Sequence, residues 1–388
     1  MTQETDIIVV GAGLVGLTAA VAFSQLGKSV VLVDASKAEP IQAISWDARI
    51  YAITPSTENW LKSLGVWHYV DTARVNDIHA MYLWNDAPDS PLILADSDAN
   101  VPKLGVIVEN RNLIDALQAN IHEDSRLTIK AATCKHVAYT AQHICLTLDD
   151  ETQLCAKLLV AADGADSFVR SALGIATHHK SFHQTAIVTN YLAEKNHGDI
   201  ARQWFGSHET LALLPLPGKH VSIVWSLSTE RAADLLLTNS EQLAERVQAR
   251  TGNALGALES VSKVLSFPLN QATAMQLIAE RVVLVGDAAH KVHPMAGQGV
   301  NLGFRDVIAL QDLLAKTHVL QNIGERAFLR RYERARQADI VSMNSLTSGL
   351  DYLFATEQSM LKQLTNFGMR QLNREGFAKK ILIKQAIA

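Results

Sequence analysis

The sequence predicts an α/β protein with a parallel sheet at its amino end, an inserted, mainly antiparallel β-sheet domain, and a helical C-terminus. First, an apolar run at residues 6–10 precedes a helical pattern at 14–26 and a second apolar run at 29–34, the order of a right-handed strand–helix–strand unit. Second, short alternating runs fill the middle of the chain. Third, a buried-strand pattern returns at residues 281–286, so the first domain is expected to be discontinuous.

The middle of the chain has the pattern of antiparallel strands. Alternating runs at 128–155 and 185–227 predict the sheet of the inserted domain. Helical patterns at 230–237 and 240–250 are expected to cover this sheet. A further helical pattern spans 300–314, and the chain beyond it is almost wholly helical in pattern.

The composition is that of an ordinary globular enzyme, with 48% hydrophobic and 19% charged residues among 388. A formal charge of −4 disfavours nucleic acid as a partner. Cys134, Cys145 and Cys155 have the spacing of neither a zinc site nor a CxxC pair, which indicates reduced thiols and a cytoplasmic location. The apolar stretch 7–23 follows acidic residues and is interrupted by glycines, so we expect neither a signal peptide nor a membrane span there.

A glycine loop lies between the first predicted strand and helix. Gly11, Gly13 and Gly16 permit a tight turn and let backbone N–H groups approach a pyrophosphate at the helix N-terminus. Asp34 ends the second strand, where a carboxylate binds an adenosine ribose and repels a 2′-phosphate. The alternative is a glycine-rich turn of an unrelated α/β protein. The strand, helix and acid in register favour FAD or NAD instead.

A second pattern, residues 285–303, separates FAD from NAD. Asp287 ends a buried strand, where its carboxylate can accept hydrogen bonds from a polyol such as ribityl. Residues 297–303 open a helix whose N-terminal dipole would stabilise negative charge on a reduced isoalloxazine. Turn chemistry alone is the alternative, which the length of the pattern disfavours. The sequence therefore predicts FAD.

A third element, Asp163 and Gly164 after a predicted strand, is weak alone because Asp-Gly is common in turns. In this chain order, the glycine loop, this element and the Gly-Asp pair at Asp287 resemble the FAD-dependent aromatic monooxygenases of the p-hydroxybenzoate hydroxylase fold. The phrases GDAAH and HPMAGQGVNLG, followed by residues 329–336, resemble one branch of these enzymes, the UbiH/UbiF-like hydroxylases of ubiquinone biosynthesis. The resemblance covers nearly the whole chain.

The resemblance implies a Rossmann-like FAD-binding domain and a monooxygenase cycle. NAD(P)H would reduce the flavin, O₂ would add at C4a, and the hydroperoxide would hydroxylate the ring of a polyprenylated phenol. No metal is expected, and no catalytic side chain is assigned because the flavin carries the chemistry. Pro294 and His290 are expected near the flavin and substrate, His290 as a general base or as a loop histidine bonded to backbone. The expected cofactor-binding residues are Gly11, Gly13, Gly16, Asp34, Arg49, Arg111, Asp163, Gly164, Asp287, Gly297, Gly299, Asn301 and Leu302.

The same resemblance divides the chain into domains. The FAD-binding domain is expected at residues 1–71, 101–178 and 270–350, the substrate domain at 72–100 and 179–269, and an amphipathic helical tail at 351–388. Basic and apolar residues mix in this tail. Two interpretations stay open: the tail lies on an anionic membrane or a lipid carrier, or it packs on the FAD domain.

The expected partners follow from the implied reaction. They are the polyprenylated aromatic substrate, O₂, lipid-binding or other ubiquinone-biosynthesis proteins, and a membrane surface reached by the tail. The expected location is the cytoplasm, peripheral at the inner membrane. Two other functions stay open: an FAD-dependent lipid reductase of the same fold, and a non-catalytic flavoprotein of a lipid-synthesis complex. A flavin halogenase is disfavoured because no Trp-x-Trp-x-Ile-Pro segment is present.

Overall fold

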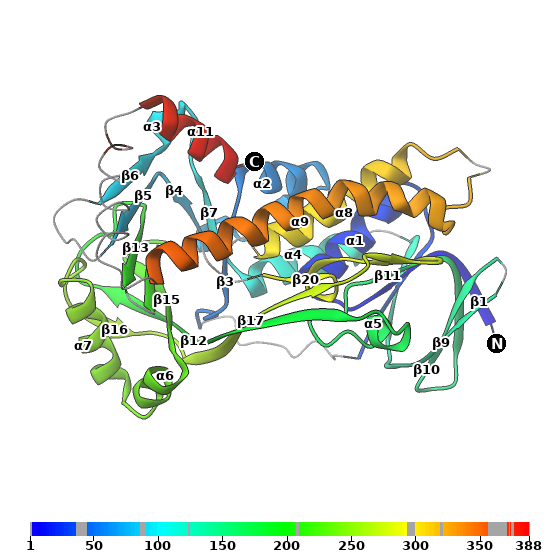
Figure 1. Ribbon diagram of the computed structural model, residues 1–388, viewed down its shortest axis with the longest axis horizontal. Helices are drawn as coiled ribbons and strands as arrows, with labels where there is room; N and C mark the ends of the chain where they lie inside the picture. Colours follow the sequence, from blue (N-terminus) through cyan, green and yellow to red (C-terminus); the bar gives the residue numbers. More distant parts are fainter. Residues whose placement is uncertain are drawn as a thin grey trace.

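The expected strand–helix–strand unit opens the computed structural model of the chain (Figure 1). β1 (Thr2–Val10) leads through the glycine loop into α1 (Leu14–Gln25), and β2 (Val30–Asp34) pairs with β1 in parallel. Apolar side chains of both strands are fully buried, as in a sheet covered on both faces. The structure describes residues 2–35, 45–85, 91–122, 125–140, 142–206, 209–292, 299–318, 321–355, 371, 373 and 376–387.

The first sheet has the strand order β18-β19-β11-β1-β2-β8. All pairs from β19 to β8 are parallel, and β18 adds an antiparallel edge. These further strands are β8 (Leu127–Ala131), β11 (Gln153–Ala161), β18 (Ile278–Ala279) and β19 (Val282–Leu284). Because parallel strands end at one edge, the three motifs that follow β1, β11 and β19 converge there.

The alternating runs at 128–155 join this first sheet. β9 (Cys134–Tyr139) and β10 (Ile144–Leu148) form a hairpin, and β10 pairs with β11. Their placement in the antiparallel sheet of the inserted domain was therefore wrong, because alternation identifies a half-exposed strand but not its partner. Register also sets Cys145 opposite Cys155, with Cα atoms 4.1 Å apart, in a disulfide. The inference of reduced thiols was wrong for these two cysteines, since cross-strand register decides their pairing.

The second sheet is mainly antiparallel, as predicted, with the order β20-β17-β12-β15-β14-β13-β5-β6. Its strands are β5 (Ala80–Trp84), β6 (Leu92–Ala95), β12 (Thr177–Ala193), β13 (Ile200–Gly206), β14 (Glu209–Pro215), β15 (His220–Ser228), β16 (Leu258–Ser260), β17 (Leu265–Ala274) and β20 (His290–Lys291). The predicted helices α6 (Thr229–Leu236) and α7 (Ser240–Arg250) bury their apolar faces with one side of this sheet. The other side is left to line a cavity.

A small sheet of order β3-β7-β4 also borders this cavity. It consists of β3 (Ile50–Ile53), β4 (Val75–Ile78) and β7 (Gly105–Glu109), all antiparallel. The neighbouring helices are α2 (Pro55–Ser63), α3 (Asp96–Ala99), α4 (Asn110–His122) and the short 3₁₀ turns η1 (Val66–Tyr69) and η2 (Thr72–Arg74). The small sheet therefore forms part of the cavity wall, together with residues of the first and second sheets.

The C-terminal third is helical. α8 (Gly299–Ala315) packs on α1, and the long α9 (Arg326–Ala355) runs along α8 and reaches β13 (Figure 1). The last helix, α11 (Gly376–Ile387), packs on α3. The remaining short elements are α5 (Phe168–Ala172) and η3 (Gly286–Ala288). Across the described ranges, no helix combines the length and apolar character needed to span a bilayer.

Candidate active site

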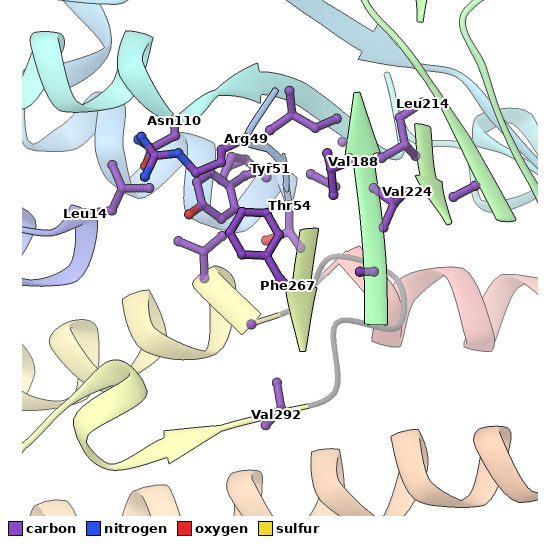
Figure 2. A pocket seen from close by; sticks show the side chains of 18 of the residues that line it. Leu14, Arg49, Tyr51, Thr54, Asn110, Val188, Leu214, Val224, Phe267 and Val292 are labelled. Carbon is purple, nitrogen blue, oxygen red and sulfur yellow. The ribbon is translucent and has the colours of Figure 1, made fainter. Parts of the chain in front are cut away.

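A cavity of about 750 Å³ lies between the first sheet and the open face of the second. Figure 2 shows Leu14, Arg49 and Tyr51 on one side of it and Val188 and Val224 on the facing strands. Residues from all three motifs contribute to its lining: Gly13, Gly164, Gly286, Asp287 and Gly299. The lining is thus polar where the motifs converge, and along the second sheet it mixes apolar side chains with the polar Gln203, Thr210 and Ser226.

The glycine loop is built by close backbone packing. Gly11 has φ +101°, and a Cβ on it would lie 2.4 Å from the Ala162 carbonyl oxygen. A Cβ on Gly16 would lie 1.8 Å from the Gly11 carbonyl oxygen. The Asp34 carboxylate accepts a hydrogen bond from Ala12 N–H at 2.5 Å, which holds the loop against the end of β2. Gly13 caps α1 without a side-chain bond, so first-turn N–H groups are available to a pyrophosphate.

Asp287 sits on a tight turn at the end of β19. Gly286 has φ +58° and lies against Val15 of α1. The Asp287 side chain is exposed and faces the open space of the cavity. The protein packed around this space desolvates the carboxyl group and raises its pKa, with His290 and Lys291 acting in the opposite direction. A carboxylate that faces a cavity in this way is placed to accept hydrogen bonds from hydroxyl groups of a bound ligand.

A buried ion network holds this turn. Asp306 of α8 is fully buried and accepts hydrogen bonds from Gly286 N–H at 2.9 Å and from His290 Nε2 at 2.6 Å. Its second oxygen accepts one from Arg336 Nε of α9 at 2.6 Å. Burial alone would raise the pKa of Asp306, but His290 and Arg336 lower it. One carboxylate therefore fixes both ends of the turn that carries Asp287.

His290 has a contact in this network that neither sequence interpretation, a general base or a loop histidine bonded to backbone, included. The ring is only 2% exposed, and its Nε2 contacts a carboxylate rather than backbone. Its buried Nδ1 has no hydrogen-bond partner within the part of the chain that the structure describes. His290 thus positions the Asp287 turn. Pro294 and Gly297, expected beside it, lie outside the described residues.

The Asp-Gly element joins the same edge. Asp163 accepts a hydrogen bond from Val169 N–H at 3.0 Å, and its other carboxylate oxygen is buried without a partner among the described residues. Gly164 lines the cavity with φ +84°. Arg170 Nη1 donates to the Ala288 carbonyl at 2.9 Å, so the second and third motifs are linked directly. A buried carboxylate oxygen without a partner among the described residues is a group that a water molecule or a ligand commonly completes.

Asn301 and Leu302 use their side chains inside the protein. The Asn301 amide accepts from Thr54 N–H at 3.1 Å and donates to the Ala52 carbonyl at 2.7 Å, while Leu302 is fully buried. Gly299, at the start of α8, lines the cavity. Asn301 and Leu302 can therefore contact a cofactor only through their backbone. They lie in the first turn of α8, where the N–H groups have no partner within the helix.

The two predicted arginines lie in different environments. Arg49 lines the cavity with a half-exposed side chain, 3.7 Å from Asp47. Arg111 is buried outside the cavity lining, where it donates to the Ser45 carbonyl at 2.6 Å and lies 3.8 Å from Glu109. The structure thus brings Arg49, but not Arg111, to the cavity surface, and cofactor binding by either arginine stays a prediction.

Several cavity residues were not predicted. Tyr51 of β3 lines the polar end (Figure 2), and burial raises its pKa. Ala212 and Gln203 lie on the open face of the second sheet, and Ile383 of α11 reaches the cavity from the C-terminus. A strand alternation indicates which residues share a face but not which face borders a cavity. The unusual Arg-Ile-Tyr-Ala-Ile-Thr run around Tyr51 was the available signal.

Comparison with known proteins identifies the family. A family model described as an FAD binding domain matches residues 4–344. The chain is 32% identical to ubiquinone hydroxylase UbiL of Rhodospirillum rubrum, over 99% of this chain and 90% of that protein. It is also 32% identical to the 3-demethoxyubiquinol 3-hydroxylase of Escherichia coli, over 99% of both proteins. The chain belongs to the FAD-dependent ubiquinone hydroxylase family. It shares 30% identity with human mitochondrial ubiquinone biosynthesis monooxygenase COQ6, over 95% of this chain and 89% of that protein.

Solved structures confirm the fold of this FAD-dependent hydroxylase. The p-nitrophenol 4-monooxygenase PnpA of Pseudomonas putida superposes with a TM-score of 0.82 at 16% identity, over 100% of this chain and 98% of that one. Klebsiella pneumoniae HpxO, complexed with FAD and uric acid, gives 0.75 at 18% identity, over 99% and 96%. The predicted cofactor, FAD, is confirmed by the family. The polar end fits it, because Gly13 at the start of α1, Gly164 next to Asp163, and Asp287 line one cavity.

Proposed function

We propose that this enzyme hydroxylates the aromatic ring of a polyprenylated phenol in ubiquinone biosynthesis. One observation carries the proposal: the polar end, where the three motifs meet, is continuous with a mainly apolar cavity along the second sheet. A ring placed there lies next to the flavin site, and a lipid tail finds apolar walls beyond it. The similar proteins named for ubiquinone hydroxylation support this substrate class.

The protein's own residues bind, orient and exclude water. Gly13, Gly164, Asp163 and Asp287 would hold FAD, with the helix N-terminus at Gly299 toward the isoalloxazine. When bound, FAD takes electrons from NAD(P)H and uses O₂ to place one oxygen atom on the ring. The chain supplies the enclosure that keeps water from this chemistry.

The open face of the second sheet provides room and polar contacts for the ring. Ala186 and Ala212 are small, whereas Gln203, Thr210 and Ser226 supply hydrogen-bonding side chains along the cavity. A phenol hydroxyl can bond to such groups while the ring packs over the alanines. We assign orientation of the ring to this face.

A lipid reductase of the same fold is the second candidate, because it would use the same FAD site. Oxygen incorporation separates the two. Purified enzyme with NAD(P)H, ¹⁸O₂ and a prenylated phenol should yield a product carrying one labelled oxygen atom. NAD(P)H-dependent saturation of the substrate without label would establish the reductase instead.

We further propose peripheral contact with an anionic membrane on the cytoplasmic side, or with a lipid-carrying protein of the pathway. The outer face of α11 exposes Lys380, Ile381, Leu382 and Lys384, a combination suited to acidic headgroups and acyl chains. Flotation with anionic and with neutral vesicles tests this. Equal flotation with both, or none with either, contradicts the membrane contact.

The test in cells is mass spectrometry of quinone lipids after deletion of the gene. We expect a precursor lacking one hydroxyl group to accumulate, and the intact gene but not an Asp287→Ala version to restore the normal profile. The missing oxygen also identifies the carbon that is hydroxylated. An unchanged profile in a strain without a redundant hydroxylase would contradict the substrate assignment while leaving the FAD site intact.

A further inference from the structure

The C-terminal helix α11 forms part of the cavity wall. Ile383 is 2% exposed, lines the cavity and packs in one cluster with Ile78 and Leu104. Met81 and Leu94 pack against this cluster and line the cavity as well. These side chains make this part of the lining mainly apolar, although Arg202 and Gln203, which follow Ala201 of the same cluster on β13, also line the cavity.

Two polar contacts of described residues help to hold the C-terminal segment in place. Asn373 donates to the Pro91 carbonyl at 2.7 Å and accepts from Ile93 N–H at 3.0 Å, so its amide pairs with the edge of β6. Lys379 lies 3.6 Å from Asp98 of α3. Both anchors are on residues 91–98, and Figure 1 shows α11 beside α3 above the second sheet. The described part of the C-terminal segment thus packs on residues 91–98 and on the apolar cluster of Ile78 and Leu104 beside the cavity.

The same helix also faces solvent. Ile381 is 44% exposed and Leu382 is 41% exposed, although Ile383 next to them is buried. Successive residues of a helix point about 100° apart, so these side chains lie on different faces. α11 is therefore a wall one helix thick, with Ile383 toward the cavity and apolar side chains outside.

The two ends of the cavity determine how a prenylated phenol lies in it. Polar groups such as Asp287 and Tyr51 are at one end, so the ring and hydroxyl belong there and the tail points toward Ile383. A cavity of about 750 Å³ is of the size that holds a drug-sized ligand. It cannot enclose an isoalloxazine, a ring and a long polyprenyl tail together, so the tail has to leave the protein.

We propose that the lipid tail leaves the cavity past α11 and that Ile383 is the specificity-determining residue at this exit. This inference rests on the proposed function, since it takes a prenylated phenol as the ligand. The apolar side chains of Ile381 and Leu382 outside the helix extend the path from the cavity to the surface.

The test compares Ile383→Trp with Ile381→Trp, which adds the same bulk two residues away on an exposed face. The probes are a phenol with one isoprene unit and its homologue with three, titrated into FAD-loaded enzyme and followed by the flavin absorbance change. We expect Ile383→Trp to raise the dissociation constant of the three-unit phenol about tenfold relative to that of the one-unit phenol. Overpacking costs of this order predict such a change. Ile381→Trp and Ile383→Ala should leave the long homologue bound at least as well as in the wild type.

Binding and turnover distinguish the two proposals. If the wild type binds both phenols without hydroxylating them, the proposed function fails while the ratio of the two dissociation constants still decides the exit. Equal weakening of both phenols by Ile383→Trp, no weakening of either, or absence of binding to the wild type would overturn the exit at α11. FAD content and melting temperature of each variant identify a folding defect, and retained binding of the one-unit phenol confirms an intact site.

Discussion

The two ends of the cavity are built by different physical means. At the flavin end, separate segments are joined by buried, directional bonds: Asp306 to Gly286, His290 and Arg336, and Arg170 to Ala288. At the tail end, apolar side chains around Ile383 pack without such bonds. Directional bonds fix atoms to within a fraction of an ångström, as a cofactor requires. Apolar packing fixes mainly volume, which suits a lipid tail.

The largest contrast is expected at the glycine loop. Gly16→Ala should prevent folding of the FAD site, because its Cβ would lie 1.8 Å from the Gly11 carbonyl oxygen. Gly349→Ala, in α9 and outside the cavity lining, is the matched control, since its Cβ would meet nothing within 4 Å. The bound FAD per protein and the circular dichroism of both variants check this. A Gly16→Ala protein that purifies with a full complement of FAD would contradict it.

Breaking the buried network comes next. Asp306→Asn leaves Arg336 and His290 without their anionic partner, and loss of one member of a buried ion pair costs about 3–5 kcal/mol of unfolding free energy. Asp339→Asn, at a side chain 27% exposed that pairs with Arg305 and Arg336, should cost about 1 kcal/mol or less. Urea unfolding measures both values. Equal losses in the two variants would show that burial does not set the strength of this network.

The same network gives a pH dependence. The pKa of Asp306 is lowered in the folded protein, so its stabilising contribution is present above the unfolded pKa of about 3.9. It is lost as the pH falls through the folded pKa. The stability difference between wild type and Asp306→Asn should therefore be constant near neutrality and shrink below about pH 4. A difference that grows as the pH falls would be inconsistent with this sign.

On the open face of the second sheet we expect a substitution to affect the substrate but not FAD binding. Ala212→Phe fills space on the open sheet face and should lower kcat/KM for a prenylated phenol about 10- to 100-fold, as overpacking costs of about 1–3 kcal/mol imply. FAD binding should be unchanged. Ala212→Ser controls for the position with little added volume. A loss of FAD in the Phe variant would mean that the two ends are not independent.

The smallest effect is expected at Asp287, where one substitution should change protein stability and FAD binding in opposite directions. Its raised pKa means that the carboxylate contributes stability below its unfolded pKa, and that this contribution is lost as the pH rises through the folded value. At neutral pH, Asp287→Asn should therefore raise the melting temperature of FAD-free protein by about 1–2 °C while weakening FAD binding. Asp34→Ala, which removes the acceptor for Ala12 N–H, should lower both. A destabilised FAD-free Asp287→Asn protein would refute the assignment.

Sequence reasoning was most successful where function depends on local backbone. The glycine loop and the Asp287 turn were predicted because Gly11 and Gly286 adopt positive φ, and the residues that need such turns are adjacent in the chain. The expected binding of an adenosine ribose by Asp34 stays a prediction; in the structure its carboxylate accepts a hydrogen bond from Ala12 N–H of the loop. In these cases the few residues that form the turn are also the residues that reveal it in the sequence.

Sequence reasoning failed where distant segments meet. The hairpin β9–β10 and the Cys145–Cys155 disulfide depend on strand register. The side chain of Asn301 ties α8 to β3 through Thr54 and Ala52, and nothing in its neighbourhood indicates that partner. His290 was weighed as a base or a backbone contact, whereas Asp306 and Arg336, far along the chain, determine its role.

The sequence by itself determined the α/β class, the FAD loop and the identity of the carboxylates at the strand ends, because short-range periodicity and turn chemistry encode them. Only the tertiary structure decided the cavity: which sheet face stays open, that Tyr51 and Ala212 line it, and that Ile383 closes it from the C-terminus. A cavity is the space that remains after long-range packing. No local pattern in the chain specifies that space.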